Sequence, residues 1–223
     1  MQSISPGTIF RGNYAWEKSL PQIAKLTKNP LVLGRGIHTK SLRNKILIDL
    51  KNQNLSVESA NLQFDCCYED ISRIKRIILT NNNDSVIAAG GGKVLDSGKY
   101  IADSLNITSI TVPFSASTCA GWTALSNIYT KDGQFIKDVP LGACPKILVY
   151  DHKFIQTAPS RTLASGIADA LAKWYESSIT SSKLDDGLVQ QAIQISRVLR
   201  DQLLIDGGKA FKGQFENNPS WQN

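Results

Sequence analysis

The chain has 223 residues, of which 42% are hydrophobic and 20% are charged. This composition is ordinary for a soluble globular protein, and it supplies a core without disulfide or metal staples. The net charge is +6, but the basic residues are scattered and form no run interleaved with aromatic residues. We therefore expect no nucleic-acid partner. The positive charge suits anionic small molecules such as phosphorylated cofactors.

Cysteine usage and the N-terminus indicate the compartment. None of Cys66, Cys67, Cys119 and Cys144 forms a C-x-x-C pair, so we expect reduced thiols. The first residues lack the basic start and apolar run of a secretion signal, and no stretch is long and apolar enough for a bilayer. We expect a soluble, cytoplasmic protein with no membrane partner.

Short apolar runs alternate with amphipathic stretches as far as Pro113. The pattern predicts strands over 31–34, 54–64, 85–89 and 107–112, and helices over 39–52, 70–79 and 93–105. Strands separated by helices favour a parallel α/β sheet, because parallel neighbours need crossover connections. A β-hairpin is then predicted over 126–136, turned at Asp132-Gly133, and one more strand over 146–150.

Beyond Pro159 the sequence is helical. Helices are predicted over 162–178 and 185–205, the second ended by Gly207-Gly208 and followed by a polar tail with a lone apolar Trp221. One face of the second helix collects Leu188, Ala192, Ile195, Leu199 and Leu203. A domain boundary is placed near residue 157. Two helices alone make an unfinished domain, and the alternative is a helical pair packed back onto the sheet.

Three segments carry candidate chemistry. The first is the run Gly90-Gly91-Gly92-Lys93 between a buried strand and a helix, where glycines allow close backbone approach and the helix N-terminus attracts a pyrophosphate. It is neither a G-x-G-x-x-G fingerprint nor a P-loop, and a ligand-free turn is the alternative.

The second segment is the small, hydroxyl-rich stretch 112–126, which begins where a parallel strand ends, the usual place for ligands in open α/β sheets. A plain connecting loop is the alternative there. The third is the helix around Asp169, a carboxylate on a face of apolar and small residues, which must be paired, bound to metal or exposed.

Taken in order and spacing, these segments resemble glycerol dehydrogenases, a branch of the iron-containing (group III) alcohol dehydrogenases that shares its fold with dehydroquinate synthase. The motifs are Gly-Gly-Gly-Lys-x-x-Asp at 90–96, Pro-x-x-Ala-Ser-Thr at 113–118, Ala-Leu-Ser-x-Ile-Tyr-Thr at 124–130 and Gly-Ile-x-Asp-Ala-Leu-Ala-x-Trp at 166–174. The similarity runs from about Pro6 to Glu176.

The resemblance implies a Rossmann-like dinucleotide-binding domain over 1–157, followed over 158–223 by the first helices of an incomplete, all-α metal-binding domain. It implies an NAD(P)-dependent oxidoreductase that transfers hydride between a metal-bound alcohol or polyol and the nicotinamide, with an active site between the domains. The intact enzyme would hold Zn²⁺ or Fe²⁺ and form a homo-oligomer. The matching cofactor positions are Gly91, Gly92, Lys93, Asp96, Ser117, Thr123, Leu125 and Tyr129, and the matching metal ligand is Asp169.

Three positions depart from the family pattern. The two histidine ligands of the family lie beyond this chain, whose only histidines, His38 and His152, are expected to be ordinary surface residues, so the chain is expected to be truncated and inactive alone. Arg35 replaces an aspartate that binds the ribose of NAD, which predicts a preference for NADP, and a solvated arginine with no role is the alternative. Cys119 replaces an aspartate near the substrate hydroxyls, and with Trp122 nearby it makes glycerol a poor fit as substrate.

Two other interpretations stay open at this point. One is a lyase-type cyclase of the dehydroquinate synthase kind, against which the Ala-Ser-Thr loop argues. The other is a non-catalytic nucleotide-binding remnant.

Overall fold

The computed structural model describes residues 3–181 and 186–212, so Trp221 lies outside the described part. The chain divides into two compact units. One comprises Met1–Ser115 and Cys119–Thr157, and the other comprises Ala116–Thr118 and Ala158–Asn223. None of the described helices is long and apolar enough to cross a membrane.

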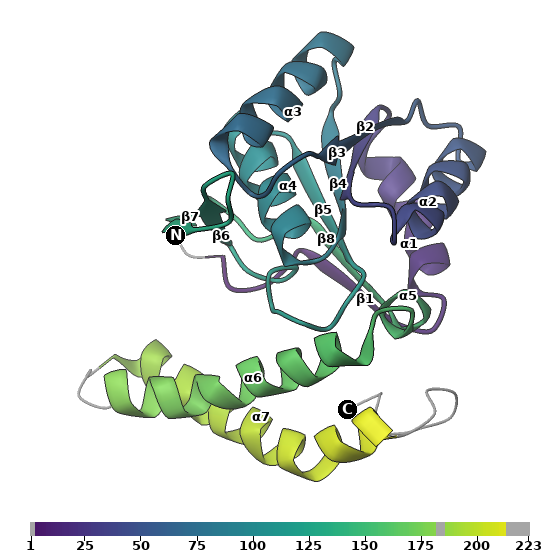
Figure 1. Ribbon diagram of the computed structural model, residues 1–223. Coiled ribbons are helices and arrows are strands. Elements are labelled where there is room, and N and C mark those ends of the chain that lie inside the picture. Colours follow the sequence, from purple (N-terminus) through teal and green to yellow (C-terminus); the bar gives the residue numbers. More distant parts are fainter. Residues whose placement is uncertain (1–2, 182–185, 213–223) are drawn as a thin grey trace. The chain divides into compact units, whose positions relative to one another are not determined.

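The first unit is built on a sheet of six parallel strands in the order β1-β8-β5-β4-β2-β3 (Figure 1). The strands are β1 (Thr8–Gly12), β2 (Pro30–Arg35), β3 (Glu58–Leu62), β4 (Ser85–Gly90), β5 (Thr108–Pro113) and β8 (Ile147–Asp151). Because all are parallel, their carboxyl ends share one edge of the sheet. The predicted α/β class with a parallel sheet is confirmed.

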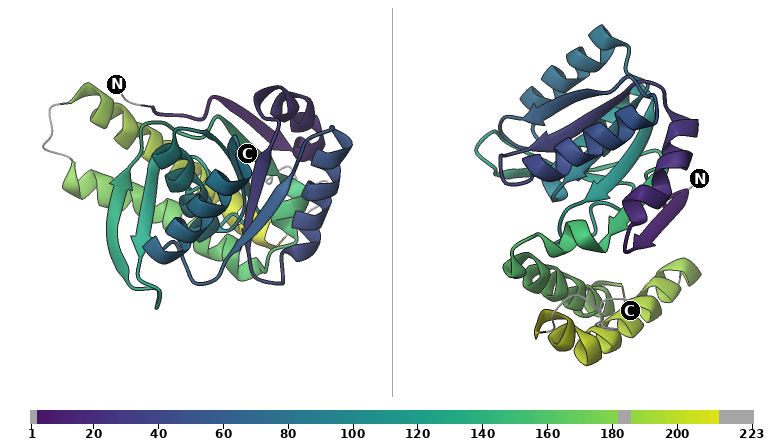
Figure 2. Two further views of the ribbon diagram at one scale, coloured as in Figure 1. Left: turned by 90° about the horizontal axis from the view of Figure 1, so that it is seen from above. Right: turned by 90° about the vertical axis from the view of Figure 1, so that its right-hand side faces the viewer.

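Helices cover both faces of this sheet (Figure 2). α1 (Ala15–Leu26) and α2 (Lys40–Asn52) pack on one face, and α3 (Tyr68–Asn81) and α4 (Gly92–Leu105) pack on the other. Alternation along each strand supplies both cores, since Val32 faces α1 and α2 whereas Leu31 and Leu33 face α3 and α4. The apolar periodicity that predicted α3 comes from its buried side chains, which include Ile71, Ile74 and Ile78.

A separate antiparallel hairpin joins β6 (Leu125–Tyr129) to β7 (Phe135–Pro140). Its turn is where the sequence predicts it, with Gly133 at a φ of +83° and its amide donating to the carbonyl oxygen of Thr130 at 3.0 Å. A glycine is required there because other residues rarely adopt positive φ. The hairpin matters for the site because its turn lies beside the start of α4.

Three elements of this unit were not predicted: β1, α1 and the short helix α5 (His152–Gln156). The helix α1 contains Pro21, which removes a backbone donor and masks the helical pattern. Its buried face is nevertheless regular, with Trp16, Leu20 and Ile23 spaced by four and three residues. The helix α5 begins at an N-cap, Asp151, whose carboxylate accepts from the amide of Lys153 at 2.9 Å.

In the described part of the second unit, α6 (Ser160–Thr180) and α7 (Gly187–Lys212) pack against each other. The prediction that Gly207-Gly208 ends the last helix is wrong, because neither glycine adopts positive φ and the helix continues to Lys212. The predicted apolar face is also not the buried one: Leu188 and Ile195 are 64% and 69% exposed. The buried residues of α7 are instead Ile193, Gly207 and Ala210.

Candidate functional site: a basic cluster at the start of α4

The candidate site lies at the carboxyl edge of the sheet, where the strand order places β4 between β2 and β5. The chain passes from β2 outward to β3 and then returns to β4 on the other side of β2, so the direction of winding reverses between β2 and β4. Open α/β sheets bind their ligands at the carboxyl ends of the strands beside such a switch point. The glycine run follows β4, so α4 begins beside this switch point. The first turn of α4 presents amide groups without intrahelical acceptors.

Two glycines in the run have different reasons to be there. A Cβ on Gly90 would lie 2.9 Å from the Cβ of Val94, so packing of the first turn requires this glycine. A Cβ on Gly91, the N-cap of α4, would meet nothing closer than the hydroxyl oxygen of Ser115 at 4.0 Å. The position that a Cβ on Gly91 would take is therefore open, at the residue where α4 begins. A ligand bound by the backbone amides at the N-terminus of α4 could occupy this position.

A buried carboxylate links the ends of three neighbouring strands. The Asp65 carboxylate, which follows β3, accepts a hydrogen bond from the Lys93 ammonium of α4. The Arg35 guanidinium, at the end of β2, lies 3.9 Å from the same Asp65 oxygen. The second Asp65 oxygen accepts from the Cys66 amide at 2.8 Å. Two cations and one carboxylate leave this cluster with a net charge of +1.

The hairpin completes the surroundings of Lys93. The Lys93 ammonium lies 4.8 Å from the centroid of the Tyr129 ring, a cation–π contact. A Cβ on Gly133 would lie 3.6 Å from an Asp65 oxygen and 3.8 Å from the Lys93 ammonium. The structure thus brings together the predicted residues Arg35, Lys93 and Tyr129. Asp65 was missed, although an acidic residue three positions after the end of β3, at the binding edge, was the available signal.

A second polar cluster, buried under the first turns of α4, gathers three further predicted residues. The Lys99 ammonium lies 3.1 Å from Asp96 and donates to the carbonyl oxygens of Thr123, at 3.0 Å, and Leu125. Burial raises the pKa of Asp96 and lowers the pKa of Lys99. Sequence reasoning missed Lys99, which looked like one more surface lysine. Its ammonium fixes the 123–125 segment to α4.

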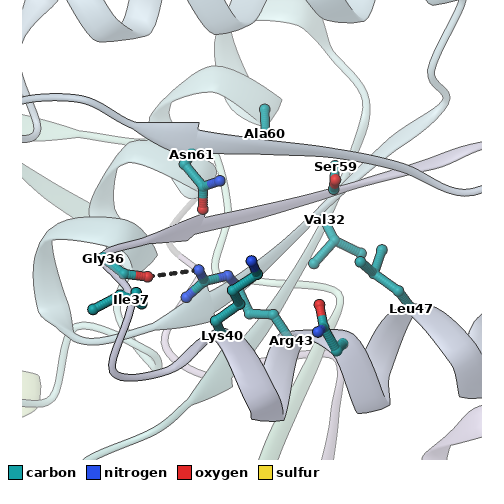
Figure 3. A pocket seen from close by; sticks show the side chains of 10 residues that line it. Val32, Gly36, Ile37, Lys40, Arg43, Leu47, Ser59, Ala60 and Asn61 are labelled. Atoms are coloured by element: carbon teal, nitrogen blue, oxygen red, sulfur yellow. Dashed lines mark hydrogen bonds between the residues drawn. The ribbon is translucent and has the colours of Figure 1, made fainter.

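The loop after β2 is shaped by Arg43 of α2. The Arg43 guanidinium donates to the carbonyl oxygen of Arg35 at 3.0 Å. It also donates to the carbonyl oxygen of Gly36 at 2.7 Å (Figure 3). A Cβ on Gly34 would lie 2.1 Å from the Arg43 side chain, so the glycine before Arg35 makes room for this arrangement. A cavity of about 410 Å³ lies beside the loop, and the cationic residues lining it are Lys40 and Arg43.

The remaining predicted cofactor and substrate positions are less enclosed. Ser117 belongs to the segment Ala116–Thr118, which groups with the helical unit, and a Cβ on Gly166 of α6 would lie 1.7 Å from the carbonyl oxygen of Ala116. Cys119 is an exposed free thiol. The Trp122 indole donates to the carbonyl oxygen of Ile4 at 3.2 Å.

The predicted metal ligand, Asp169, has a side chain 43% exposed and lies 3.4 Å from the Lys173 ammonium, one turn along α6. Within residues 3–181 and 186–212, no group of three His, Cys, Asp or Glu side chains is arranged to hold a metal ion. His38 is exposed on the loop after β2, and burial lowers the pKa of His152. The described residues therefore do not fit a metal centre, and no chemical step is assigned to one.

Residues 6–152 match the family model of iron-containing alcohol dehydrogenases. The chain belongs to this family. It is 38% identical over 209 residues to an uncharacterized oxidoreductase of Synechocystis sp., covering 93% of this chain and 54% of the relative. It is 30% identical over 211 residues to glycerol dehydrogenase of Escherichia coli, covering 92% of this chain and 58% of that protein.

Solved structures of the family agree with the fold. A probable glycerol dehydrogenase from Sinorhizobium meliloti superposes with a TM-score of 0.86 at 25% identity, covering 99% of this chain and 62% of that one. Glycerol dehydrogenase from Schizosaccharomyces pombe superposes with a TM-score of 0.80 at 29% identity, covering 94% and 55%. The chain thus spans about half the length of the relatives it matches, and the match establishes an oxidoreductase family of the alcohol and glycerol dehydrogenase type.

Proposed function

We propose that this chain binds a nicotinamide dinucleotide at the start of α4 and serves the oxidation or reduction of small alcohols or polyols. The observation that carries the proposal is the open space beside Gly91, which lies at the N-terminus of α4 with Lys93 next to it. An anionic diphosphate suits that position, because amide dipoles and a lysine charge both favour it. When bound, the nicotinamide would supply the hydride acceptor or donor.

The chain's own residues would bind and orient this coenzyme. The glycine turn and Lys93 would hold the diphosphate, while the Lys99 anchor keeps the 123–125 segment in place beside α4. Arg35 ends β2, the strand next to β4, where an arginine accommodates a 2′-phosphate. We therefore propose that NADP is preferred over NAD. Cys119, in place of an acidic residue, favours a substrate other than glycerol.

We expect no turnover by this chain with added zinc and common polyols, since the described residues supply no three-ligand metal site. Coenzyme binding does not need that metal. Coenzyme binding by this chain is therefore expected without catalysis.

Calorimetric titration of the purified chain with NADP and with NAD tests the proposal. Both coenzymes are expected to bind, NADP about tenfold more tightly, a difference of about 1.4 kcal/mol. Tighter binding of NAD would refute the NADP preference. Absence of binding by both would refute the proposed function itself, and turnover in a parallel assay with zinc and polyols would refute the expected inactivity.

A further inference from the structure

The position of Asp65 between two cations bears on which coenzyme the site selects. Its side chain is only 5% exposed, whereas those of Arg35 and Lys93 are each 41% exposed. The Asp65 carboxylate also accepts a hydrogen bond from the Cys66 amide at 2.8 Å. Asp65 is thus a buried carboxylate, and the two cations beside it are partly exposed to solvent.

The two cations are held unequally. Lys93 donates directly to Asp65 and also lies over the Tyr129 ring, with the Gly133 turn beside it. Arg35 is 3.9 Å from Asp65, and among the described residues its guanidinium has no other charged partner. A phosphate near the end of β2 would therefore compete with a single carboxylate for Arg35.

We propose that Asp65 is a specificity-determining residue, which holds the Arg35 guanidinium and thereby limits the preference for NADP over NAD. The inference rests on the proposed binding of a nicotinamide dinucleotide at the start of α4. NADP and NAD share the diphosphate and differ by the 2′-phosphate. Any influence of Asp65 through Lys93 on the diphosphate therefore cancels in the ratio of the two affinities. The influence through Arg35 does not cancel.

The test is the ratio of NADP to NAD affinity, measured by calorimetry on the purified chain and its variants. Asp65→Asn removes the charge and keeps an oxygen that accepts from the Cys66 amide. The variant is expected to raise the ratio by roughly fivefold to tenfold, because removing a carboxylate next to Arg35 strengthens its attraction for a dianionic phosphate. If Asp65→Asn is unstable, Asp65→Ser replaces it, because the serine hydroxyl can also accept the hydrogen bond from the Cys66 amide. The same rise in the ratio is expected for this variant.

Two controls make the result specific. Glu58→Gln makes the same charge change on an exposed residue at the start of β3, the end of the strand away from Asp65, and is expected to leave the ratio unchanged. In an Arg35→Ala background, Asp65→Asn is expected to raise the ratio clearly less than in the wild type, since only the direct repulsion between the carboxylate and the phosphate is then relieved. An unchanged or lower ratio in Asp65→Asn alone would overturn the inference while the binding proposal stands. Failure of the wild-type chain to bind either coenzyme would overturn both.

Discussion

Replacing Lys99 with methionine is expected to lower the free energy of unfolding by about 3–5 kcal/mol, because the change leaves a buried carboxylate without its cation. The Lys99 and Asp96 side chains are 1% and 10% exposed, so water does not replace the missing partner. The carbonyl oxygens of Thr123 and Leu125 also lose their donor. Urea unfolding followed by circular dichroism measures the effect.

The loss in free energy of unfolding caused by Lys99→Met is expected to become smaller as the pH falls. Burial raises the pKa of Asp96 in the folded protein above its value in the unfolded chain. The stability that Asp96 contributes is therefore complete at a pH below the unfolded-state pKa, and it is lost as the pH rises through the folded-state pKa. Lys99 opposes this rise, and without it the folded pKa of Asp96 moves higher still. A protonated carboxyl needs no cation. The variant should therefore differ less from the wild type at about pH 5 than at pH 7.

Lys51→Met is the matched control, because Lys51 is exposed near the end of α2. It is expected to change the free energy of unfolding by less than about 0.5 kcal/mol. A loss in Lys99→Met no larger than in this control would contradict the assignment of Lys99 as a buried anchor.

Replacing Gly98 with alanine is expected to destabilise the chain by about 1–3 kcal/mol, against the usual trend for a glycine inside a helix. The added Cβ would lie 2.5 Å from the Cβ of Ala88, so α4 must move off β4. The alanine's better helix propensity recovers at most about 1 kcal/mol. Overpacking therefore outweighs propensity, and denaturant unfolding gives the sign directly.

Gly208→Ala tests the same substitution without a steric conflict. Gly208 lies inside α7, and a Cβ there would meet nothing within 4 Å. This variant is expected to gain up to about 1 kcal/mol through helix propensity. The interpretation fails if both glycine variants change stability with the same sign.

The central strands of the parallel sheet were predictable because they are short apolar runs bounded by glycine, proline or helical periodicity. The strands β2, β4 and β5 are buried on both faces, so the runs are unbroken and easily recognised. The helix α1 was missed because Pro21 interrupts its pattern, and the bond it removes is compensated by burial of Trp16 and Ile23. Local sequence does not reveal that compensation.

The residues of the candidate site also differ in whether local sequence could predict them. Gly91 and Lys93 were predictable because glycine between a strand and a helix has a specific conformational use. Asp65 and Lys99 were not, because their roles depend on partners 28 residues and 24 residues away in the sequence. The end of α7 was misjudged for a related reason. A glycine pair stops a helix only when one adopts positive φ, and packing of Gly207 beside Ile167 keeps the helix going.

The central claim is that the helix start at Gly91 holds a dinucleotide, and coenzyme titration of Gly91→Ala against the wild type tests it most directly. The structure has room for the methyl group, so the fold should lose less than about 1 kcal/mol of stability. The methyl would occupy the space left for the ligand, so affinity for both NADP and NAD is expected to fall at least tenfold, or about 1.4 kcal/mol. Coenzyme binding by a folded Gly91→Ala variant as tight as by the wild type would contradict the claim.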